Sequence, residues 1–368
     1  MRVICEGLDL SDAVLKVIKA TAVRTTNPIL EGIKLHASED TLTLSATDLE
    51  ISIEKTIPAD VKIAGDVVVP GKFFADFVKK LSNEQIELSS TEQGTLKIRY
   101  TDSEGYLQLL NAEEFPIIKT FDESDYFVVS KFDFRDAIDK TIFAVALDDA
   151  RPILKGCKFE IAGGEMTVAA LDGFRIAQVK HKLINSSKDM EFVIPARCLA
   201  EVSKLIDGED EELKIHVSDN YLLVNLGSTN IMTRKLEGEF INYKNALGTA
   251  STTEIIVNKR QLEYGLERAS LLARFNTNNL VKFDIRDKLL TMTSSSDIGN
   301  VTEKITISLD GKDLVIAFNA RYIADCLRNI QEEYIKMSFA SSIYPCTITS
   351  PENNSYLFVV FPVRLMGE

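Results

Sequence analysis

An internal repeat with a period of 124 residues constrains the fold of this chain more than any other feature. The segment PILEGIKLHASEDTLTLSATD at 28–48 aligns without a gap with PILKGCKFEIAGGEMTVAALD at 152–172, and a further step of 124 leads to NTNNLVKFDIRDKLLTMTSSS at 276–296. The same spacing, found twice and in several segments, predicts three copies of one domain, each long enough for its own core. We expect the three domains at 1–120, 121–247 and 248–368.

Hydropathy patterning predicts the same elements in each copy. The first copy opens with apolar residues at helical spacing around Val14, with Ser11 as the expected N-cap. A second helix is expected after Pro70, and its counterparts after Pro195 and Asn319. Between the helices, apolar and polar residues alternate with a period of two, which is typical of strands with one buried face. The predicted fold class is α+β, with two helices packed on antiparallel sheet in each copy.

Composition narrows the classes of function. The chain has 368 residues and a formal charge of −13, which argues against a protein that grips nucleic acid or an anionic membrane by bulk charge. Apolar runs fall short of the ~18–20 residues that span a bilayer. Glu6 and Asp9 near the N-terminus do not fit a secretory signal. Five widely spaced cysteines fit thiols in a reducing compartment, so we expect a cytoplasmic protein.

Catalytic constellations are missing from the sequence. The pair Asp48 and Asp172 could suggest catalytic carboxylates, but the two residues hold one position in two copies, so a turn aspartate is expected. Gly163-Gly164 fits a hairpin turn and lacks the spacing of a phosphate-binding loop. Three scattered histidines do not suggest a metal site. We therefore expect neither enzymatic activity nor a cofactor.

Several motifs, taken in their order and with the 124-residue spacing, resemble one family over essentially the whole chain. They are PILEG at 28–32, ATDLE at 46–50, EFP at 114–116, LDGFR at 171–175 and VVFPVRL at 359–365. The family is the bacterial DNA polymerase III beta subunit, the replicative sliding clamp. The resemblance implies a non-catalytic processivity factor, in which two chains join head to tail into a six-domain ring around double-stranded DNA. It further implies binding of the replicative polymerase, the clamp loader and repair proteins through short peptide motifs, without a membrane.

The resemblance also implies residues that contact DNA. We expect these to be Arg24, Arg151, Lys80, Arg197 and Lys204. Arg24 and Arg151 precede the two PIL motifs, where the family contacts DNA; a surface arginine near a helix end is the alternative. The helices also carry acidic residues, so a basic channel is not established by the sequence, and solvated helix faces stay open as an interpretation.

A partner pocket between the second and third copies is the next implied site. Its expected residues are Leu154, Leu171, Gly173, Phe174, Arg175, Ile176, Ile241, Ala246, Val359, Phe361, Pro362, Val363, Arg364 and Leu365. A peptide pocket needs apolar walls and a few polar groups, whereas each aliphatic residue taken singly also fits ordinary core packing. The chain departs from the family pattern T-D-G-H-R-L at Leu171, Phe174 and Ile176, and from M-P-M-R-L at Phe361 and Val363. Because methionine is flexible, its replacement predicts a stiffer pocket that prefers a modified peptide.

The subunit contact is the third implied site. Leu271 and Leu272 match family positions that hold the ring shut, and Tyr106 with Leu107 is the expected opposing surface. One core residue beside one boundary residue is the alternative for the leucine pair. The alternative function for the whole chain is a repeat-built protein-interaction scaffold that does not encircle DNA.

Overall fold

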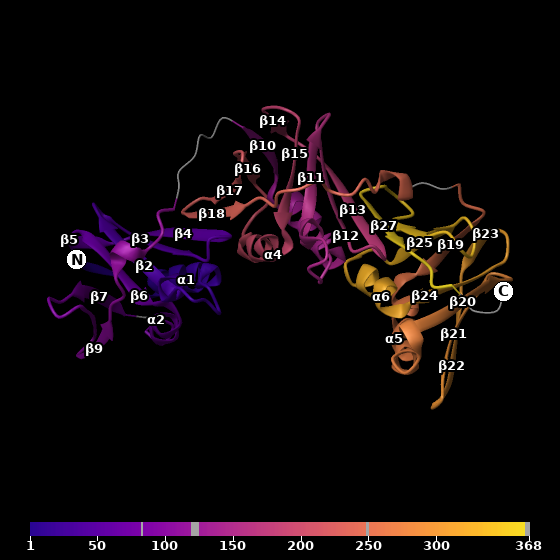
Figure 1. The fold of residues 1–368 in the computed structure, drawn as a ribbon, viewed down its shortest axis with the longest axis horizontal. Coiled ribbons are helices and arrows are strands. Elements are labelled where there is room, and N and C mark those ends of the chain that lie inside the picture. The colour runs from indigo at the N-terminus through magenta and orange to yellow at the C-terminus, as the bar shows by residue number, and fades with distance from the viewer. Residues whose placement is uncertain (82–83, 119–124, 248–249, 365–368) are drawn as a thin grey trace. The chain divides into compact units, whose positions relative to one another are not determined.

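The computed structural model describes residues 1–81, 84–118, 125–247 and 250–364 (Figure 1). The chain forms two compact units, which are described separately. Unit 1 comprises Met1–Lys131, Ile184–Lys188 and Glu201–Lys235, and unit 2 comprises Phe132–Leu183, Asp189–Ala200 and Leu236–Glu368. The second predicted copy therefore contributes residues to both units.

Each predicted copy contains two α-helices in the described part of the chain, which confirms the pattern expected from sequence. The helices are α1 (Gly7–Val17), α2 (Gly71–Val78), α3 (Lys131–Asp139), α4 (Ala196–Leu205), α5 (Lys259–Ala273) and α6 (Ala320–Arg328). Short 3-10 turns are η1 (Ile18–Ala20), η2 (Pro28–Glu31), η3 (Ala112–Glu114), η4 (Ile142–Ala144), η5 (Pro152–Lys155), η6 (Lys244–Ala246) and η7 (Thr277–Asn279).

The expected N-cap at Ser11 is wrong. Helix α1 begins at Gly7, directly after a strand that ends at Glu6, so Ser11 lies buried inside the helix. A Cβ atom at Gly7 would lie 2.3 Å from the carbonyl oxygen of Leu81, and the Gly7 N–H donates to Glu84 O at 2.9 Å. The close backbone approach at Gly7 therefore fixes the start of the helix, and a side-chain cap does not.

Two antiparallel sheets form unit 1. The five-stranded sheet has the order β5 (Asp60–Ile63), β1 (Arg2–Glu6), β7 (Gln85–Ser90), β8 (Thr95–Tyr100), β9 (Ser103–Gln108). The nine-stranded sheet has the order β14 (Asn185–Ser186), β10 (Tyr126–Ser130), β16 (Glu212–Val217), β17 (Tyr221–Leu226), β18 (Thr229–Arg234), β4 (Ile51–Pro58), β3 (Thr41–Thr47), β2 (Gly32–Ser38), β6 (Gly65–Pro70). Helix α1 packs against β4 and α2, which buries its apolar stripe.

Two antiparallel sheets also form unit 2. The nine-stranded sheet has the order β15 (Met190–Pro195), β11 (Gly156–Ala162), β12 (Glu165–Leu171), β13 (Arg175–Lys182), β27 (Tyr356–Val360), β26 (Cys346–Thr349), β25 (Tyr334–Phe339), β19 (Thr253–Asn258), β23 (Ser308–Gly311). The four-stranded sheet has the order β22 (Gly299–Thr306), β21 (Leu289–Ser296), β20 (Leu280–Arg286), β24 (Leu314–Asn319). Helix α5 packs against β21, β22 and α6.

Each nine-stranded sheet joins strands of two consecutive copies. In unit 1, β4 of the first copy pairs with β18 of the second, with Ile53 opposite Ile231. In unit 2, β13 of the second copy pairs with β27 of the third, with Ala177 opposite Phe358. Ile53 and Ala177 are 124 residues apart, so the same strand of each copy makes the junction.

Two glycine features of the sequence have different causes in the structure. Gly163 and Gly164 connect β11 to β12 with φ angles of 59° and 78°, which confirms the predicted hairpin turn. The repeated glycine of the PIL motifs has a different cause. A Cβ at Gly32 would lie 2.6 Å from Val68 Cγ1, and one at Gly156 would lie 2.6 Å from Ile194 O. Both glycines are therefore required by close packing against the neighbouring strand.

Replacing Gly156 with alanine should lower the free energy of unfolding by about 1–3 kcal/mol, because the added methyl group has no space beside β15. Urea denaturation followed by circular dichroism measures this change. Gly163→Asn is the matched control, since nothing lies within 4 Å of its Cβ position and asparagine tolerates a positive φ. Equal effects of the two substitutions would contradict the packing explanation.

Candidate partner pocket and interface surfaces

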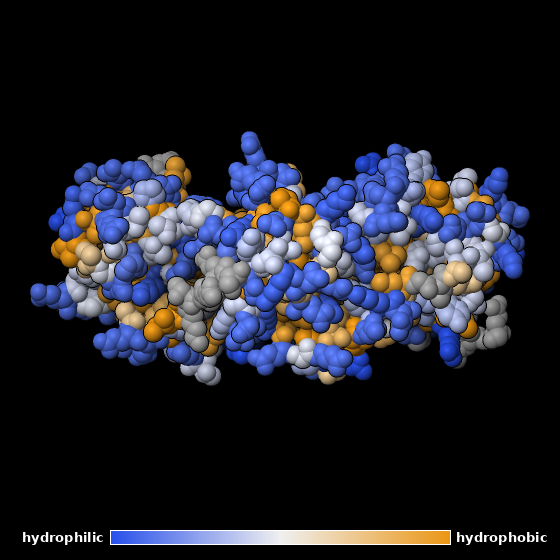
Figure 2. Space-filling view, turned by 90° about the horizontal axis from the view of Figure 1, so that it is seen from above, coloured by the Kyte–Doolittle hydropathy of each residue, from blue (hydrophilic) through white to orange (hydrophobic). Residues whose placement is uncertain are grey.

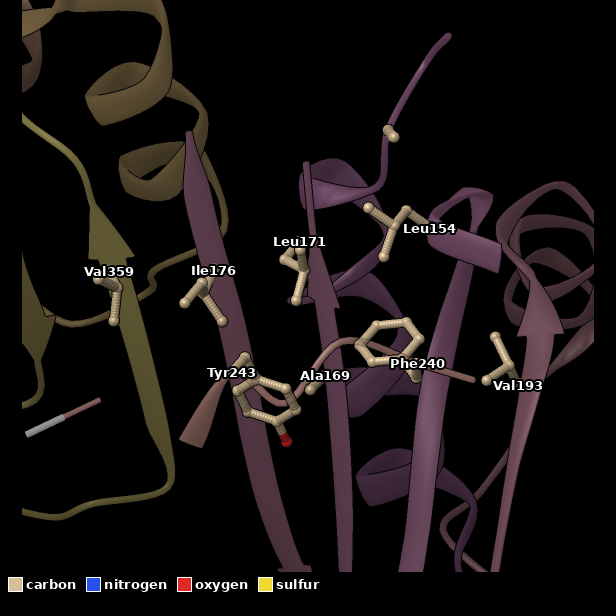
Figure 3. Close-up of a cluster of buried hydrophobic side chains, with 9 residues drawn as sticks. Leu154, Ala169, Leu171, Ile176, Val193, Phe240, Tyr243 and Val359 are labelled. Carbon is tan, nitrogen blue, oxygen red and sulfur yellow. The ribbon is translucent and has the colours of Figure 1, made fainter. Parts of the chain in front are cut away.

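An apolar cluster in unit 2 brings together many of the residues expected in the partner pocket (Figure 3). Leu154, Leu171, Ile176 and Val359 are buried in it, with Ile176 on β13 beside Val359 on the adjacent β27. Three other expected residues are partly buried and pack against the cluster, namely Ile241, Ala246 and Phe361. The structure therefore collects residues from three distant parts of the sequence at one place.

Sequence reasoning missed part of this cluster. The additional buried members are Ala146, Ala169, Val193, Phe240 and Tyr243. The repeat held a signal for the first of them, because Ala146 lies 124 residues after Ala22, and each alanine N–H donates to the carbonyl of the leucine in its PIL motif at 2.9 Å. The aromatic pair Phe240 and Tyr243 had no counterpart at the 124-residue spacing and could not be found in this way.

The loop between β12 and β13 presents Phe174 on the surface beside the cluster. Asp172 Oδ1 accepts hydrogen bonds from the N–H groups of Phe174 and Arg175 at 2.9 and 3.0 Å. Asp48 Oδ1 accepts the same two bonds in the first copy, from Glu50 and Ile51. Both aspartates thus act as turn residues, as the sequence predicted. Phe174 is 58% exposed, and its ring stacks on that of Tyr322 with 5.6 Å between centroids.

Arg175 is buried at the base of this loop, where five groups hold its guanidinium. Its Nε lies 3.1 Å from Asp172 Oδ2, its Nη1 lies 2.5 Å from Asp325 Oδ2, and its Nη2 donates to Phe143 O at 2.7 Å. The guanidinium carbon also lies 5.4 Å from the centre of the Phe143 ring and 4.9 Å from that of Tyr322. We call this set the Arg175 network. A buried cation is tolerated because two carboxylates and a carbonyl compensate its lost hydration.

The end of the described chain is held in place beside the same loop. The Phe361 N–H donates to Phe174 O at 3.0 Å, and the Val363 N–H donates to Ala317 O at 2.8 Å. Pro362 and Val363 are half-buried, Arg364 is exposed, and Leu365 lies outside the described residues. Gly173 is exposed with a φ of 89°, which favours glycine at this turn.

The residues expected to contact DNA are all exposed and are divided between the two units. Arg24, Lys80 and Lys204 belong to unit 1, whereas Arg151 and Arg197 belong to unit 2. Lys204 pairs with Glu201 of its own helix at 2.7 Å. Basic residues elsewhere on the helices pair in the same way, as in Lys16–Asp12, Lys140–Asp136, Lys259–Glu263 and Arg328–Asp325. The helices therefore carry balanced charge. The face of the molecule shown in Figure 2 is largely hydrophilic, with smaller apolar areas.

The residues expected at the subunit contact lie on two separate surfaces. On β9, Tyr106 is 58% exposed and Leu107 is half-buried. On α5, Leu271 is 59% exposed and Leu272 is half-buried, so neither leucine is a core residue. Leu271 lines a surface cavity of about 640 Å³ between α5 and α6. Single exposed aliphatic side chains are common on protein surfaces, so the subunit contact stays a prediction.

Two of the buried cysteines are poorly suited to act as nucleophiles. Burial raises the pKa of the Cys5 and Cys157 thiols to about 12, which keeps both protonated near neutral pH. Among the described residues, no group of three or more histidine, cysteine, aspartate or glutamate side chains could hold a metal ion. No helix in the same part of the chain is long and apolar enough to cross a membrane.

An α+β chain of three similar domains, whose sheets continue from one copy into the next, has the architecture of a DNA polymerase processivity clamp. Family models for the DNA polymerase III beta subunit match the N-terminal domain at 1–119, the central domain at 128–242 and the C-terminal domain at 244–364. Beta sliding clamps of Staphylococcus epidermidis and Staphylococcus aureus are each 31% identical over 357 residues, covering 94% of this chain and 95% of the relative.

Solved structures agree with these matches. The DNA polymerase sliding clamp from Bacillus subtilis superposes with a TM-score of 0.95 at 31% identity, covering 99% of each chain. The DNA polymerase III beta subunit from Thermotoga maritima superposes with a TM-score of 0.92 at 29% identity, also covering 99% of each chain.

The chain belongs to the DNA polymerase III beta subunit family of bacterial sliding clamps. Its function is that of a processivity factor in DNA replication, and it is not an enzyme. Membership implies DNA and a polymerase as partners. The fold predicted from sequence, with three clamp domains of helices on antiparallel sheet, is confirmed.

Arg175→Ala should lower the free energy of unfolding by about 3–5 kcal/mol, because it removes the buried cation that Asp172 and Asp325 share and leaves Asp325 with solvent-exposed arginines as its ion-pair partners. Arg328→Ala is the matched control. It removes a partner of the same Asp325 carboxylate, but from a side chain that is 64% exposed, so a loss within about 1 kcal/mol is expected. Urea denaturation of both variants measures the difference, and similar losses would show that burial of the Arg175 charge is not what stabilises this loop.

Proposed function

We propose that two copies of this chain join head to tail into a closed six-domain ring that traps double-stranded DNA. The observation that carries the proposal is the repeated junction between copies. Strand β4 of the first copy pairs with β18, and the equivalent β13 of the second copy pairs with β27. The equivalent strand of the third copy is β22, and it lies at the edge of its sheet in the described part of the chain.

A complementary edge is available in the first copy. Strand β9 is the counterpart of β18 and also ends its sheet among the described residues. Applying the register of the other junctions sets Val301 of one subunit opposite Gly105 of the partner subunit, next to Tyr106 and Leu107. Pairing β22 with β9 of the partner subunit satisfies backbone groups that an edge strand leaves exposed. A head-to-tail contact of this kind closes into a ring when its rotation permits.

The interface side chains support the same contact. Leu271 and Leu272 on α5, and Tyr106 and Leu107 on β9, offer exposed or half-buried apolar area next to the two edges. We propose these four residues as the subunit interface. We also propose domain boundaries at 1–120, 121–247 and 248–368, which the ranges of the three matched family models support.

Topological trapping explains the charge of the chain. A ring needs no tight phosphate contacts, each of which adds affinity and salt dependence and so opposes sliding. The net charge of −13 and the paired basic residues of the helices support such weak contact. We propose transient phosphate contacts by Arg24, Arg151, Lys80, Arg197 and Lys204, all of which are exposed. We also propose a cytoplasmic location, supported by five widely spaced cysteines, all buried.

The apolar cluster and the loop at Phe174 form the proposed partner pocket. Its proposed residues are Leu154, Leu171, Gly173, Phe174, Arg175, Ile176, Ile241, Ala246, Val359, Phe361, Pro362, Val363, Arg364 and Leu365, the last of which lies outside the described residues. Exposed Phe174 beside a buried apolar floor supports the docking of a short peptide with apolar anchors. The proposed partners are the replicative polymerase, the clamp loader and repair proteins.

Leu271→Ala combined with Leu272→Ala should convert the dimer into monomers, because it removes apolar area from one side of the proposed interface. Analytical ultracentrifugation measures the mass directly. Leu8→Ala is a matched control, since Leu8 is 60% exposed on a helix but lies outside the proposed interface. A double variant that sediments as an unchanged dimer would remove these leucines from the interface.

The pocket should bind a peptide from the organism's own polymerase more tightly than the peptide common in the family, because Phe361 and Val363 stand where flexible methionines are usual. Fluorescence titration of both peptides tests this preference. Phe174→Ala should weaken the binding of both peptides by roughly tenfold, which is the loss expected for an exposed aromatic anchor. Glu50→Ala, at the corresponding loop position of the first copy, should change neither. Equal affinities of the two peptides would contradict the preference, and an inert Phe174 would contradict the pocket.

A further inference from the structure

The Arg175 network extends beyond the partner pocket to the surface of α6. Asp325, which holds Arg175 at 2.5 Å, also pairs with Arg328 Nη1 at 2.8 Å through its other oxygen. Arg321 Nε lies 3.8 Å from the same carboxylate. The Asp325 side chain is 14% exposed, whereas those of Arg321 and Arg328 are each 64% exposed. One mostly buried carboxylate thus connects a buried arginine to two solvent-exposed arginines.

The local fold does not require Arg175. Ile51 holds the corresponding position in the first copy, and the Asp48 turn around it makes the same backbone hydrogen bonds as the Asp172 turn. The strand that follows pairs across copies in the same way in both places. Because the same turn forms around an isoleucine, the turn alone does not account for the connection between the buried guanidinium and Asp325.

The exposed arginines line the cavity of about 640 Å³ between α5 and α6, whose wall also includes Leu271 of the proposed subunit interface. Arg274, in the segment that follows α5, lines this cavity together with Arg321 and Arg328 of α6, and Ser270 and Asn279 add polar groups to its wall. Glu267 is an acidic residue on the same wall, so three guanidinium groups are opposed by Glu267 and the shared Asp325. Guanidinium groups bind phosphate with two parallel hydrogen bonds, which an ammonium group cannot match.

We propose that this cavity binds a phosphate group of the DNA backbone, and that binding there strengthens peptide binding in the partner pocket through Asp325. The inference rests on the proposed function, since both ligands are ones that it assigns. Asp325 lines the cavity, but a carboxylate does not bind a phosphate directly, so it acts here as a positioning residue for the arginines.

The coupling follows from competition for one carboxylate. A phosphate draws Arg321 and Arg328 into the cavity, so that Asp325 is left to Arg175. Arg175 is then held more firmly against Phe143 and Tyr322, and Tyr322 supports the exposed ring of Phe174. When Phe174 is already held in place, less conformational entropy is lost as the peptide docks. By reciprocity, the peptide strengthens phosphate binding by the same factor.

The test measures the dissociation constant of a fluorescein-labelled peptide, with leucine and phenylalanine anchors, for the full-length protein at low ionic strength. Titrations are run without anion, with saturating short DNA duplex, and with inorganic phosphate at matched ionic strength. We expect the duplex to tighten peptide binding about fivefold or more, a typical coupling between two sites. A similar gain with inorganic phosphate alone would identify free phosphate as a sufficient ligand; a gain with duplex only would identify the DNA backbone.

Variants separate the coupling from general electrostatics. Arg321→Gln with Arg328→Gln should abolish the gain and should tighten peptide binding without anion to about the level that duplex gives the unmodified protein, because Asp325 is then left to Arg175. Arg274 lines the same cavity, and no ion pair joins it to Asp325 in the described structure. Arg274→Gln should therefore weaken duplex binding but retain the gain in peptide affinity once duplex is saturating.

Two results would overturn the proposal. Peptide binding that is normal but insensitive to both anions, or a gain that survives in the double variant, contradicts the coupling and leaves the partner pocket intact. Absence of saturable peptide binding in the unmodified protein contradicts the pocket itself, and the coupling with it.

Discussion

Antiparallel pairing of edge strands between consecutive copies is the interaction on which the rest of the structure depends. An isolated copy would expose a row of backbone donors and acceptors at each edge, which invites uncontrolled association. The pairing of β4 with β18, and of β13 with β27, satisfies these groups and builds a continuous nine-stranded sheet in each unit. The same pairing leaves β9 and β22 as matching edges in the described chain, which is why the proposed assembly is head to tail. Such a contact closes into a ring when its rotation permits.

The proposed DNA contacts depend on charge, whereas the proposed peptide binding depends on apolar packing. Several basic residues of the helical regions pair with acidic residues one turn away. To bind a phosphate, such a residue must break an ion pair of similar strength. Weak, exchangeable contact of this kind suits a protein that must move along DNA. The proposed partner pocket differs, because its floor is a buried apolar cluster and two carboxylates and a carbonyl compensate the buried Arg175 cation.

Much of the fold could be predicted because the sequence contains three copies of its own pattern. The 124-residue spacing, the helices after Pro70 and Asn319, and the turns at Gly163-Gly164 and Asp172 all follow from local chemistry that repeats. Ser11 was misjudged because the helix start depends on a close approach between Gly7 and Leu81, which are far apart in sequence. The Arg175 network was missed for the same reason, since Asp325 lies 150 residues away and no local pattern connects it to Arg175. The strand register between copies likewise depends on long-range pairing.

The central claim is that the protein holds DNA by enclosing it. Its most direct test is retention on plasmid DNA after loading, compared between a nicked circle and the same plasmid cut once, at a salt concentration that screens phosphate contacts. The account predicts that the protein stays on the circle through gel filtration and is lost when the plasmid is linearised, because a ring slides off a free end. Equal retention on both forms, governed only by salt, would show that the protein grips DNA by charge and would contradict enclosure.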